Sequence, residues 1–237
     1  MQQKSKNILL NILSAITTLL CMLLVLFSIC FLVFNLSYSK TRVRGYSMQP
    51  TINKNVQSSN EDGDLVYVNR FRGLKTDTIV VADVGWWQKG SIIKRLVAMP
   101  GDVLYIEQTA TEYNLLVNNN LIYSKAKYDS LGNLNTDVKN YFEHKYQAFI
   151  TNTTSFDGRF VDHSSNLKEV DGKICIVLNQ DEYFLIGDNW TDSMVDCMTF
   201  GPVNKSEIVG TVELIVDVKD NMVLSVARQI LKILFSV

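Results

Sequence analysis

Histidine is scarce in this chain of 237 residues, which contains only His144 and His163. Histidine is the usual base that activates a serine nucleophile, and ordinary surface positions in a polar stretch explain both of them. The elbow motif G-x-S-x-G is missing as well, because Gln49 stands at the place of its second glycine. The sequence therefore disfavours a Ser-His-Asp triad, and a serine hydrolase built on this chain would need another base.

Metal-binding cysteine patterns and an excess of charge are also missing. The four cysteines form no CxxC or Cys/His cluster with zinc spacing, so we expect no metal and no other cofactor. Cys21 and Cys30 serve as small hydrophobic side chains in an apolar segment. Pairing of Cys175 with Cys197 depends on the fold, which their spacing does not reveal. A net charge of −1 gives no reason to expect a nucleic-acid partner.

A long segment without charge, residues 8–36, is the first strong positive signal. A helix that crosses a membrane needs about 20 apolar residues, so residues 1–40 are predicted to form a short tail and a single transmembrane anchor. The alternative is a cleaved signal peptide, with an apolar core of roughly 7–15 residues before a small-x-small site. The run is longer than that, and residues 37–39 match such a site poorly, which favours the uncleaved anchor.

The charges around this segment leave its orientation open. Lys4 and Lys6 precede it, whereas Lys40, Arg42 and Arg44 follow it. A positive-inside count would place the C-terminal side in the cytoplasm. Basic residues at a membrane surface also contact anionic lipid head groups, so membrane lipid is an expected partner in either orientation.

Short apolar and β-branched runs separated by turn signals dominate the rest of the chain. The predicted strands are residues 65–68, 78–82, 92–99, 103–106, 115–117, 174–178, 183–186 and 208–216. Many short strands with frequent turns indicate a barrel-like or sandwich architecture. We therefore expect a mainly β fold, with a barrel-like antiparallel catalytic domain formed by residues 41–117 and 172–221.

Two other segments differ from these strands in composition. Residues 118–171 are rich in Asn, Asp, Ser, Thr, Lys and Tyr, which suggests an inserted cap subdomain with loops. Residues 222–237 are apolar with two basic residues and too short to span a membrane comfortably. An amphipathic helix in the membrane interface and a helix packed on its own domain are both compatible with that pattern.

Three further segments suggest a reaction. Residues 44–51 read Arg-Gly-Tyr-Ser-Met-Gln-Pro-Thr, which places Ser47 in a turn after the apolar segment. Residues 92–102 read Ile-Ile-Lys-Arg-Leu-Val-Ala-Met-Pro-Gly-Asp. Side chains alternate along a strand, so Lys94 and Arg95 point to opposite faces. Burial among apolar residues lowers the pKa of a lysine, which would let Lys94 act as a base.

The third segment is polar and glycine-bounded, and it follows an apolar strand. Residues 187–202 read Gly-Asp-Asn-Trp-Thr-Asp-Ser-Met-Val-Asp-Cys-Met-Thr-Phe-Gly-Pro. Taken alone, it would be a long turn whose Asp and Asn side chains bind its own backbone. A loop serine and a strand lysine are equally ordinary when taken alone. Their joint occurrence with this segment, in this order, is what carries information.

Together the three segments, with residues 63–68 as a following strand box, resemble the conserved boxes of type I signal peptidases, in particular Gram-positive members. This family consists of membrane-anchored serine–lysine proteases that remove signal peptides from exported proteins. The resemblance implies that Ser47 is the nucleophile and Lys94 the general base. It places Gly45 in the oxyanion-hole turn, without the side-chain donor that some members have there.

The third segment departs from the family pattern. Trp190 and Met198 stand where arginines are usual, and Cys197 stands where a serine is usual. The resemblance implies supporting roles for Asp188 and Asp196 and a lysine-orienting hydroxyl at Ser193. Counting back from Gly201 instead places Met194 at that position, because the segment has one residue more than the family pattern.

The function implied by the resemblance is cleavage of signal peptides from exported preproteins, at the extracytoplasmic face of the cell membrane. The main alternative is a specialised or non-catalytic relative that assists a narrow substrate class such as pilin precursors. A self-cleaving repressor-type protease is a weaker alternative, because no helix-turn-helix precedes Ser47. Preprotein preference and oligomeric state are not encoded in any recognisable pattern.

Overall fold

The computed structural model describes residues 2–85, 90–108, 113–123, 142–156, 158–190, 195–219 and 223. The chain divides into two compact units, Met1–Ser39 and Lys40–Val237. Residues 124–141 of the expected cap lie outside the described residues. The same holds for the C-terminal segment 222–237 apart from residue 223, so the amphipathic helix expected there stays a prediction.

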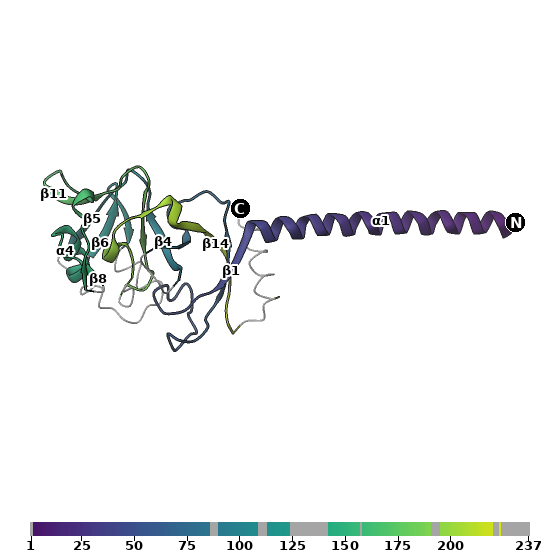
Figure 1. Cartoon of the computed structure of the whole chain (residues 1–237), viewed down its shortest axis with the longest axis horizontal. Helices are drawn as coiled ribbons and strands as arrows, with labels where there is room; N and C mark the ends of the chain where they lie inside the picture. Colours follow the sequence, from purple (N-terminus) through teal and green to yellow (C-terminus); the bar gives the residue numbers. More distant parts are fainter. Residues whose placement is uncertain are drawn as a thin grey trace. The chain divides into compact units, whose positions relative to one another are not determined.

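The first unit is a single helix, α1 (Gln2–Ser37), drawn as one continuous coil in Figure 1. Its part Leu10–Ser37 has a mean hydropathy of 2.8 and includes 28 residues. At 1.5 Å per residue this is roughly 40 Å, longer than the roughly 30 Å of a hydrocarbon core. Among the described residues it is the one helix long and apolar enough to cross a membrane. It could therefore anchor the protein, as the sequence predicts.

Polar side chains within α1 are satisfied by the helix itself. Hydroxyl or amide groups donate to carbonyl oxygens four residues earlier, at 2.7–2.9 Å, from Thr17, Thr18, Ser28 and Asn35. In hydrocarbon no water would satisfy such groups. These bonds explain how an apolar helix can carry them without disrupting a membrane anchor.

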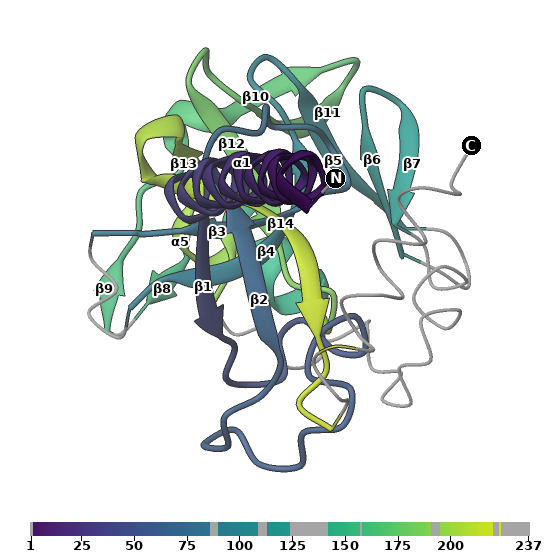
Figure 2. The same ribbon diagram turned by 90° about the vertical axis from the view of Figure 1, so that its right-hand side faces the viewer.

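The second unit is built on a curled, mainly antiparallel sheet of seven strands. Their order across the sheet is β1-β2-β14-β3-β4-β12-β13. The bounds are β1 (Tyr38–Arg42), β2 (Leu65–Asn69), β3 (Ile79–Ala82), β4 (Ile92–Ala98), β12 (Glu182–Ile186), β13 (Val203–Asn204) and β14 (Ile208–Val216). Figure 2 shows β1, β2 and β14 side by side.

Bulges bend this sheet into a half-barrel. The pairing register shifts twice along β14, between Ile208 and Gly210 against β3 and between Val212 and Leu214 against β2. Gly210 lies so close to β2 that a Cβ atom there would be 2.4 Å from the carbonyl oxygen of Asn69. Only glycine allows β14 to approach β2 this closely while it also pairs with β3.

A second antiparallel sheet has the order β10-β11-β5-β6-β7. Its strands are β5 (Val103–Gln108), β6 (Tyr113–Val117), β7 (Asn120–Tyr123), β10 (Leu167–Val170) and β11 (Lys173–Val177). In Figure 1, β5, β6 and β11 lie with α4 (Gln147–Ile150) at one end of the domain, away from β1 and β14.

The remaining elements among the described residues are short. They are the π-helical turn η1 (Phe142–Tyr146), the hairpin β8 (Ser155–Phe156) and β9 (Arg159–Phe160), the 3-10 turns η2 (Ser164–Asn166) and η3 (Lys205–Glu207), and α5 (Cys197–Phe200). The main core lies among β3, β4, β12 and the second sheet, with Phe149 of α4 and Met198 of α5 wholly buried in it. A smaller core beneath the loop after β1 includes Met48 and Ile52.

The expected mainly β fold with an N-terminal apolar helix is confirmed, and each predicted strand is present within one or two residues of its expected bounds. The cap subdomain stays a prediction. β7 and β10 come from the two ends of residues 118–171 and pair within the second sheet, beside strands of the expected catalytic domain.

Candidate active site

Ser47 lies in a tight turn that the smaller core anchors from below. The backbone N–H of Gln49 donates to the carbonyl of Tyr46 at 2.9 Å. Met48, within the turn, and Ile52, just after it, are buried, whereas Ser47 is only half-buried. Gly45 enters the turn with a φ of +84°, a left-handed conformation that favours glycine. The apolar anchors therefore leave the serine as the residue that faces outward.

A buried asparagine fixes the shape of this loop. The Asn53 side-chain amide donates to the carbonyls of Val43, at 3.2 Å, and Gly45, at 2.9 Å. Its side-chain oxygen accepts the N–H of Asp64 at 2.8 Å, and its own N–H donates to the Asp64 carboxylate at 2.7 Å. A Cβ atom on Gly63 would lie 2.0 Å from that side-chain oxygen. No role was assigned to Asn53 from the sequence, because these three partner residues come together only in the fold.

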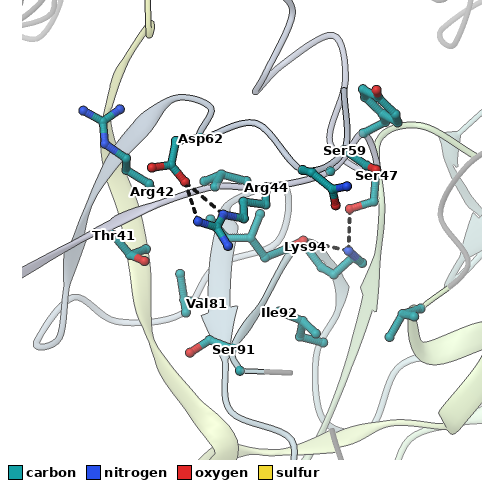
Figure 3. A pocket seen from close by; sticks show the side chains of 17 residues that line it. Thr41, Arg42, Arg44, Ser47, Ser59, Asp62, Val81, Ser91, Ile92 and Lys94 are labelled. Carbon is teal, nitrogen blue, oxygen red and sulfur yellow. Dashed lines mark hydrogen bonds and ion pairs between the residues drawn. The ribbon is translucent and has the colours of Figure 1, made fainter. Parts of the chain in front are cut away.

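Lys94 lies in β4 with its side chain directed at the turn. Its side chain is buried, with 4% of the residue exposed. The ammonium nitrogen Nζ donates to Ser47 Oγ at 2.7 Å and to the carbonyl of Ile93 at 2.9 Å. Figure 3 shows the Lys94 and Ser47 side chains pointing toward one another. The two residues that the sequence nominated as base and nucleophile are thus in direct contact.

Burial lowers the pKa of Lys94 from 10.5 to about 8. Loss of hydration is the largest cause, and the charge of Lys145 acts in the same direction. Asp196, Asp188 and Cys197 act against it by favouring the protonated form. With a pKa near 8, roughly a tenth of the Lys94 side chains are neutral at pH 7. A neutral amine 2.7 Å from a hydroxyl can accept its proton.

Arg95 points to the other face of β4, as strand alternation predicts. Its guanidinium donates to both oxygens of Asp188, at 2.7 and 2.6 Å. Asp188 is wholly buried and also accepts the Thr51 hydroxyl at 2.6 Å. The N–H of Asn189 donates to the carbonyl of Ser47 at 2.9 Å. Asp188 and its neighbour therefore tie the serine turn to β4.

Asp196, the other acidic residue with an expected supporting role, caps α5. It is wholly buried, and its carboxylate accepts the N–H of Met198 at 3.1 Å. The same carboxylate oxygen lies 3.7 Å from Nζ of Lys145. No pattern in the sequence singled out Lys145, which belongs to the polar residues 118–171.

The three departures from the family pattern are all buried. Trp190, Cys197 and Met198 belong to the main core. The Cys197 thiol accepts the N–H of Leu185 at 3.0 Å, and burial raises its pKa well above the usual range. Cys197 and Cys175 are both free, so the disulfide left open by the sequence is not formed. Ser193 and Met194 lie outside the described residues, and the lysine-orienting role of Ser193 stays a prediction.

The two histidines do not line the cleft that contains Ser47. His144 is exposed. His163 is buried with its ring stacked on Phe149 at a centroid distance of 3.9 Å, and burial lowers its pKa to about 4. Within the described part of the chain, no group of three or more His, Cys, Asp or Glu side chains could hold a metal ion.

The cleft itself has a volume of about 1020 Å³. Residues 41–47 form one wall and residues 90–94 another, with Ser47 and Lys94 among its lining residues. In Figure 3, Arg44 and Asp62 lie in the same cleft at a distance from the serine, joined by an ion pair of 2.7 Å. Residues of β1 and β4 line this groove, and an extended peptide can bind beside such strands through main-chain hydrogen bonds.

Known proteins resemble this chain in family and in sequence. The family model described as "Signal peptidase, peptidase S26" matches residues 12–217, which include most of α1 and every described strand. Signal peptidase I P of Bacillus subtilis subsp. natto is 27% identical over 198 residues. That alignment covers 81% of this chain and 84% of the Bacillus protein.

Proposed function

The chain belongs to the signal peptidase family, peptidase S26, and from that premise we propose that Ser47 and Lys94 are the catalytic dyad with which it cleaves signal peptides from exported preproteins. The observation that carries this proposal is the 2.7 Å hydrogen bond between Lys94 Nζ and Ser47 Oγ inside a peptide-sized cleft. The lowered pKa of Lys94 supports it, because only a neutral amine can take up the serine proton.

The reaction proceeds through an acyl-enzyme. An extended preprotein segment lies in the cleft, and Ser47 Oγ attacks the scissile carbonyl carbon while neutral Lys94 takes the hydroxyl proton. Protonated Lys94 then gives this proton to the leaving amine, and the C–N bond breaks. A water molecule, deprotonated by Lys94, then attacks the ester carbonyl. The C–O bond to Ser47 breaks, the second product leaves, and protonated Lys94 returns the proton to Ser47 Oγ. Serine and lysine carry each proton transfer, so the scheme calls for no cofactor.

The negative charge of the tetrahedral intermediate needs a donor. The backbone N–H of Ser47 is the proposed donor, and such a group contributes about 3–4 kcal/mol in other hydrolases. The positive φ of Gly45 sets the entry of the chain into this turn. Gly45 itself has no side chain to add a second donor, so we assign it a conformational role only.

We place the catalytic domain on the extracytoplasmic side of the membrane, where signal peptides emerge. This placement opposes the simple charge count, yet Arg42 and Arg44 have partners within the domain. Arg42 donates to the carbonyl of Gly63 at 3.2 Å, and Arg44 pairs with Asp62. Both arginines therefore have a structural role in the domain, which explains their presence after the apolar helix independently of the positive-inside rule. Exported preproteins and membrane lipid remain the proposed partners.

Cleavage of a purified preprotein by the full-length chain in detergent micelles tests the dyad. We expect Ser47→Ala and Lys94→Met each to lower kcat by about a thousand-fold or more. Ser91→Ala is the matched control, because Ser91 lines the same cleft and its hydroxyl donates to the Asp83 carboxylate. Processing by Ser47→Ala at the wild-type rate would refute the proposal.

The alternative is a non-catalytic relative that assists a narrow class such as pilin precursors. The unusual residues Trp190, Cys197 and Met198 motivated it. All three are buried in the core, and the Ser47–Lys94 contact is formed in their presence. This observation favours catalysis. A wild-type protein that binds preproteins but cleaves none of them would favour the alternative.

A further inference from the structure

Lys145 is a cation that reaches the surroundings of the catalytic lysine from a distant part of the chain. It belongs to η1, and its Nζ lies 3.7 Å from the carboxylate of Asp196. Its neighbours Tyr146 and Phe149 are buried in the main core, and η1 packs against α5. The core therefore holds the backbone that carries Lys145 against the end of the helix that Asp196 caps.

Asp196 needs such a cation because its side chain is wholly buried, with 0% exposed, while that of Lys145 is 23% exposed. A buried carboxylate is strongly unfavourable without a positive partner. Met198, two positions further along the chain, is uncharged and buried. The Lys145 ammonium group lies near the Asp196 carboxylate from another element and offsets its charge.

The charge of Asp196 matters to the active site because of where it lies. Val195, the preceding residue, lines the cleft together with Lys94. After loss of hydration, Asp196 has the largest influence on the pKa of Lys94 and raises it, whereas Lys145 lowers it.

Asp188 and Cys197 are the other titratable groups that act on Lys94, and both raise its pKa. Asp188 already forms a bidentate ion pair with Arg95, with N···O distances of 2.7 and 2.6 Å. Burial raises the pKa of the Cys197 thiol well above its usual range, so its charge acts on Lys94 only at high pH. Asp196 is therefore the acidic group whose effect on Lys94 depends on Lys145.

We propose that Lys145 is a positioning residue for the dyad: its ammonium group balances the buried Asp196 carboxylate and so helps to keep Lys94 in the neutral, proton-accepting form. This inference rests on the proposed roles of Ser47 and Lys94. It assigns a function to a residue of the polar segment 118–171, which contributes a charge to the site without contacting the substrate or the reacting atoms.

A double-mutant cycle that removes the two charges tests the proposal in the full-length chain in detergent micelles. The pH dependence of kcat/KM is measured from pH 6 to 10 for wild type, Lys145→Met, Asp196→Asn and the double variant. Lys145→Met should move the acid limb to higher pH by roughly half a unit to one unit, with a three- to ten-fold loss at pH 7. Asp196→Asn should move it to lower pH, since asparagine still caps a helix but has no charge.

The double variant should return the limb close to its wild-type position, because both charges are gone. Lys145→Arg should preserve it. Lys173→Met is the matched control, since Lys173 forms an exposed pair with Glu107 at 3.5 Å and should leave the profile unchanged. Melting temperatures establish that each variant is folded. Shifts of the two single variants in the same direction, or no shift in either, would overturn the proposal.

A second readout does not depend on cleavage. Lysines react with acetic anhydride only as neutral amines, and mass spectrometry follows acetylation of Lys94 against pH in a Ser47→Ala background. The midpoint should rise with Lys145→Met and fall with Asp196→Asn. If wild type cleaves no preprotein, the proposed function fails, whereas these midpoints still decide whether Lys145 controls Lys94. Midpoints that stay fixed would refute the inference even in an active enzyme.

Discussion

Lys94→Met is expected to abolish cleavage and yet make the protein more stable at neutral pH. In the folded chain the pKa of Lys94 falls from 10.5 to about 8 because the amine is buried. One pKa unit corresponds to about 1.4 kcal/mol, so holding the protonated amine in this site costs roughly 3 kcal/mol. Methionine has a similar length and no charge, and it tolerates an apolar site well.

Part of this gain is offset by lost hydrogen bonds. Lys94 donates to Ser47 Oγ and to the carbonyl of Ile93, and a typical bond contributes about 1 kcal/mol. Ser47 is half-buried beside the cleft, so water can replace its donor. We therefore expect a net gain of about 1–2 kcal/mol, which is roughly 3–6 °C in melting temperature for a domain of this size.

The stability difference between wild type and Lys94→Met should depend on pH. Below pH 8 both the folded and the unfolded chain hold the Lys94 proton, and the cost is fully present. Between pH 8 and 10.5 the unfolded chain binds the proton and the folded chain does not, so wild-type stability rises relative to the variant. Differential scanning fluorimetry in detergent at pH 7 and pH 10 measures both differences. A destabilised variant at pH 7, or an equal difference at both pH values, would refute the reasoning.

Three further predictions concern the same site. The kcat/KM for preprotein cleavage should rise with pH through an apparent pKa near 8, because only neutral Lys94 accepts the serine proton; a pH profile that is flat from 7 to 9 would contradict this. Gly63→Ala should lower kcat at least ten-fold and also lower the melting temperature. The alanine Cβ would displace the Asn53 side chain that shapes the serine turn. Steady-state kinetics measures the first effect and a thermal melt the second. Asp188→Asn should destabilise the domain by about 2–3 kcal/mol, because Asp188 is the buried partner of Arg95. Asp77→Asn removes the exposed partner of Arg95 and should cost less than about 0.5 kcal/mol. Urea unfolding measures both losses, and equal losses would argue against a structural role for the buried Asp188–Arg95 pair.

Strands were predictable from the sequence wherever they are paired on both sides. Runs such as residues 92–99 are apolar because β4 is buried along nearly its whole length. The strands that the sequence did not predict lie at sheet edges and are β1, β13, β10 and β7, together with the hairpin of β8 and β9. Edge strands pair on one side only and tolerate polar side chains, so β1 reads Tyr-Ser-Lys-Thr-Arg and has exposed residues. Their conformation comes from the neighbouring strand more than from their own composition.

The candidate site was predictable to a similar extent. Ser47 and Lys94 stood out because they lie in recognisable segments, and strand alternation correctly separated Lys94 from Arg95. Lys145 could not be found in this way, since its partner Asp196 is distant in sequence and the contact depends on how η1 packs against α5. Asn53 likewise gains its importance from partners on two sides of a loop.

The place of β14 in the sheet bears on when this enzyme becomes active during its synthesis. β2 and β3 do not pair with each other, because β14 lies between them and pairs with both. The loop with Ser47 precedes β2, and Lys94 lies in β4, which pairs with β3. A nascent chain thus contains both residues long before it contains β14, which completes the sheet between β2 and β3. We expect proteolytic activity only after residues 208–216 have been added.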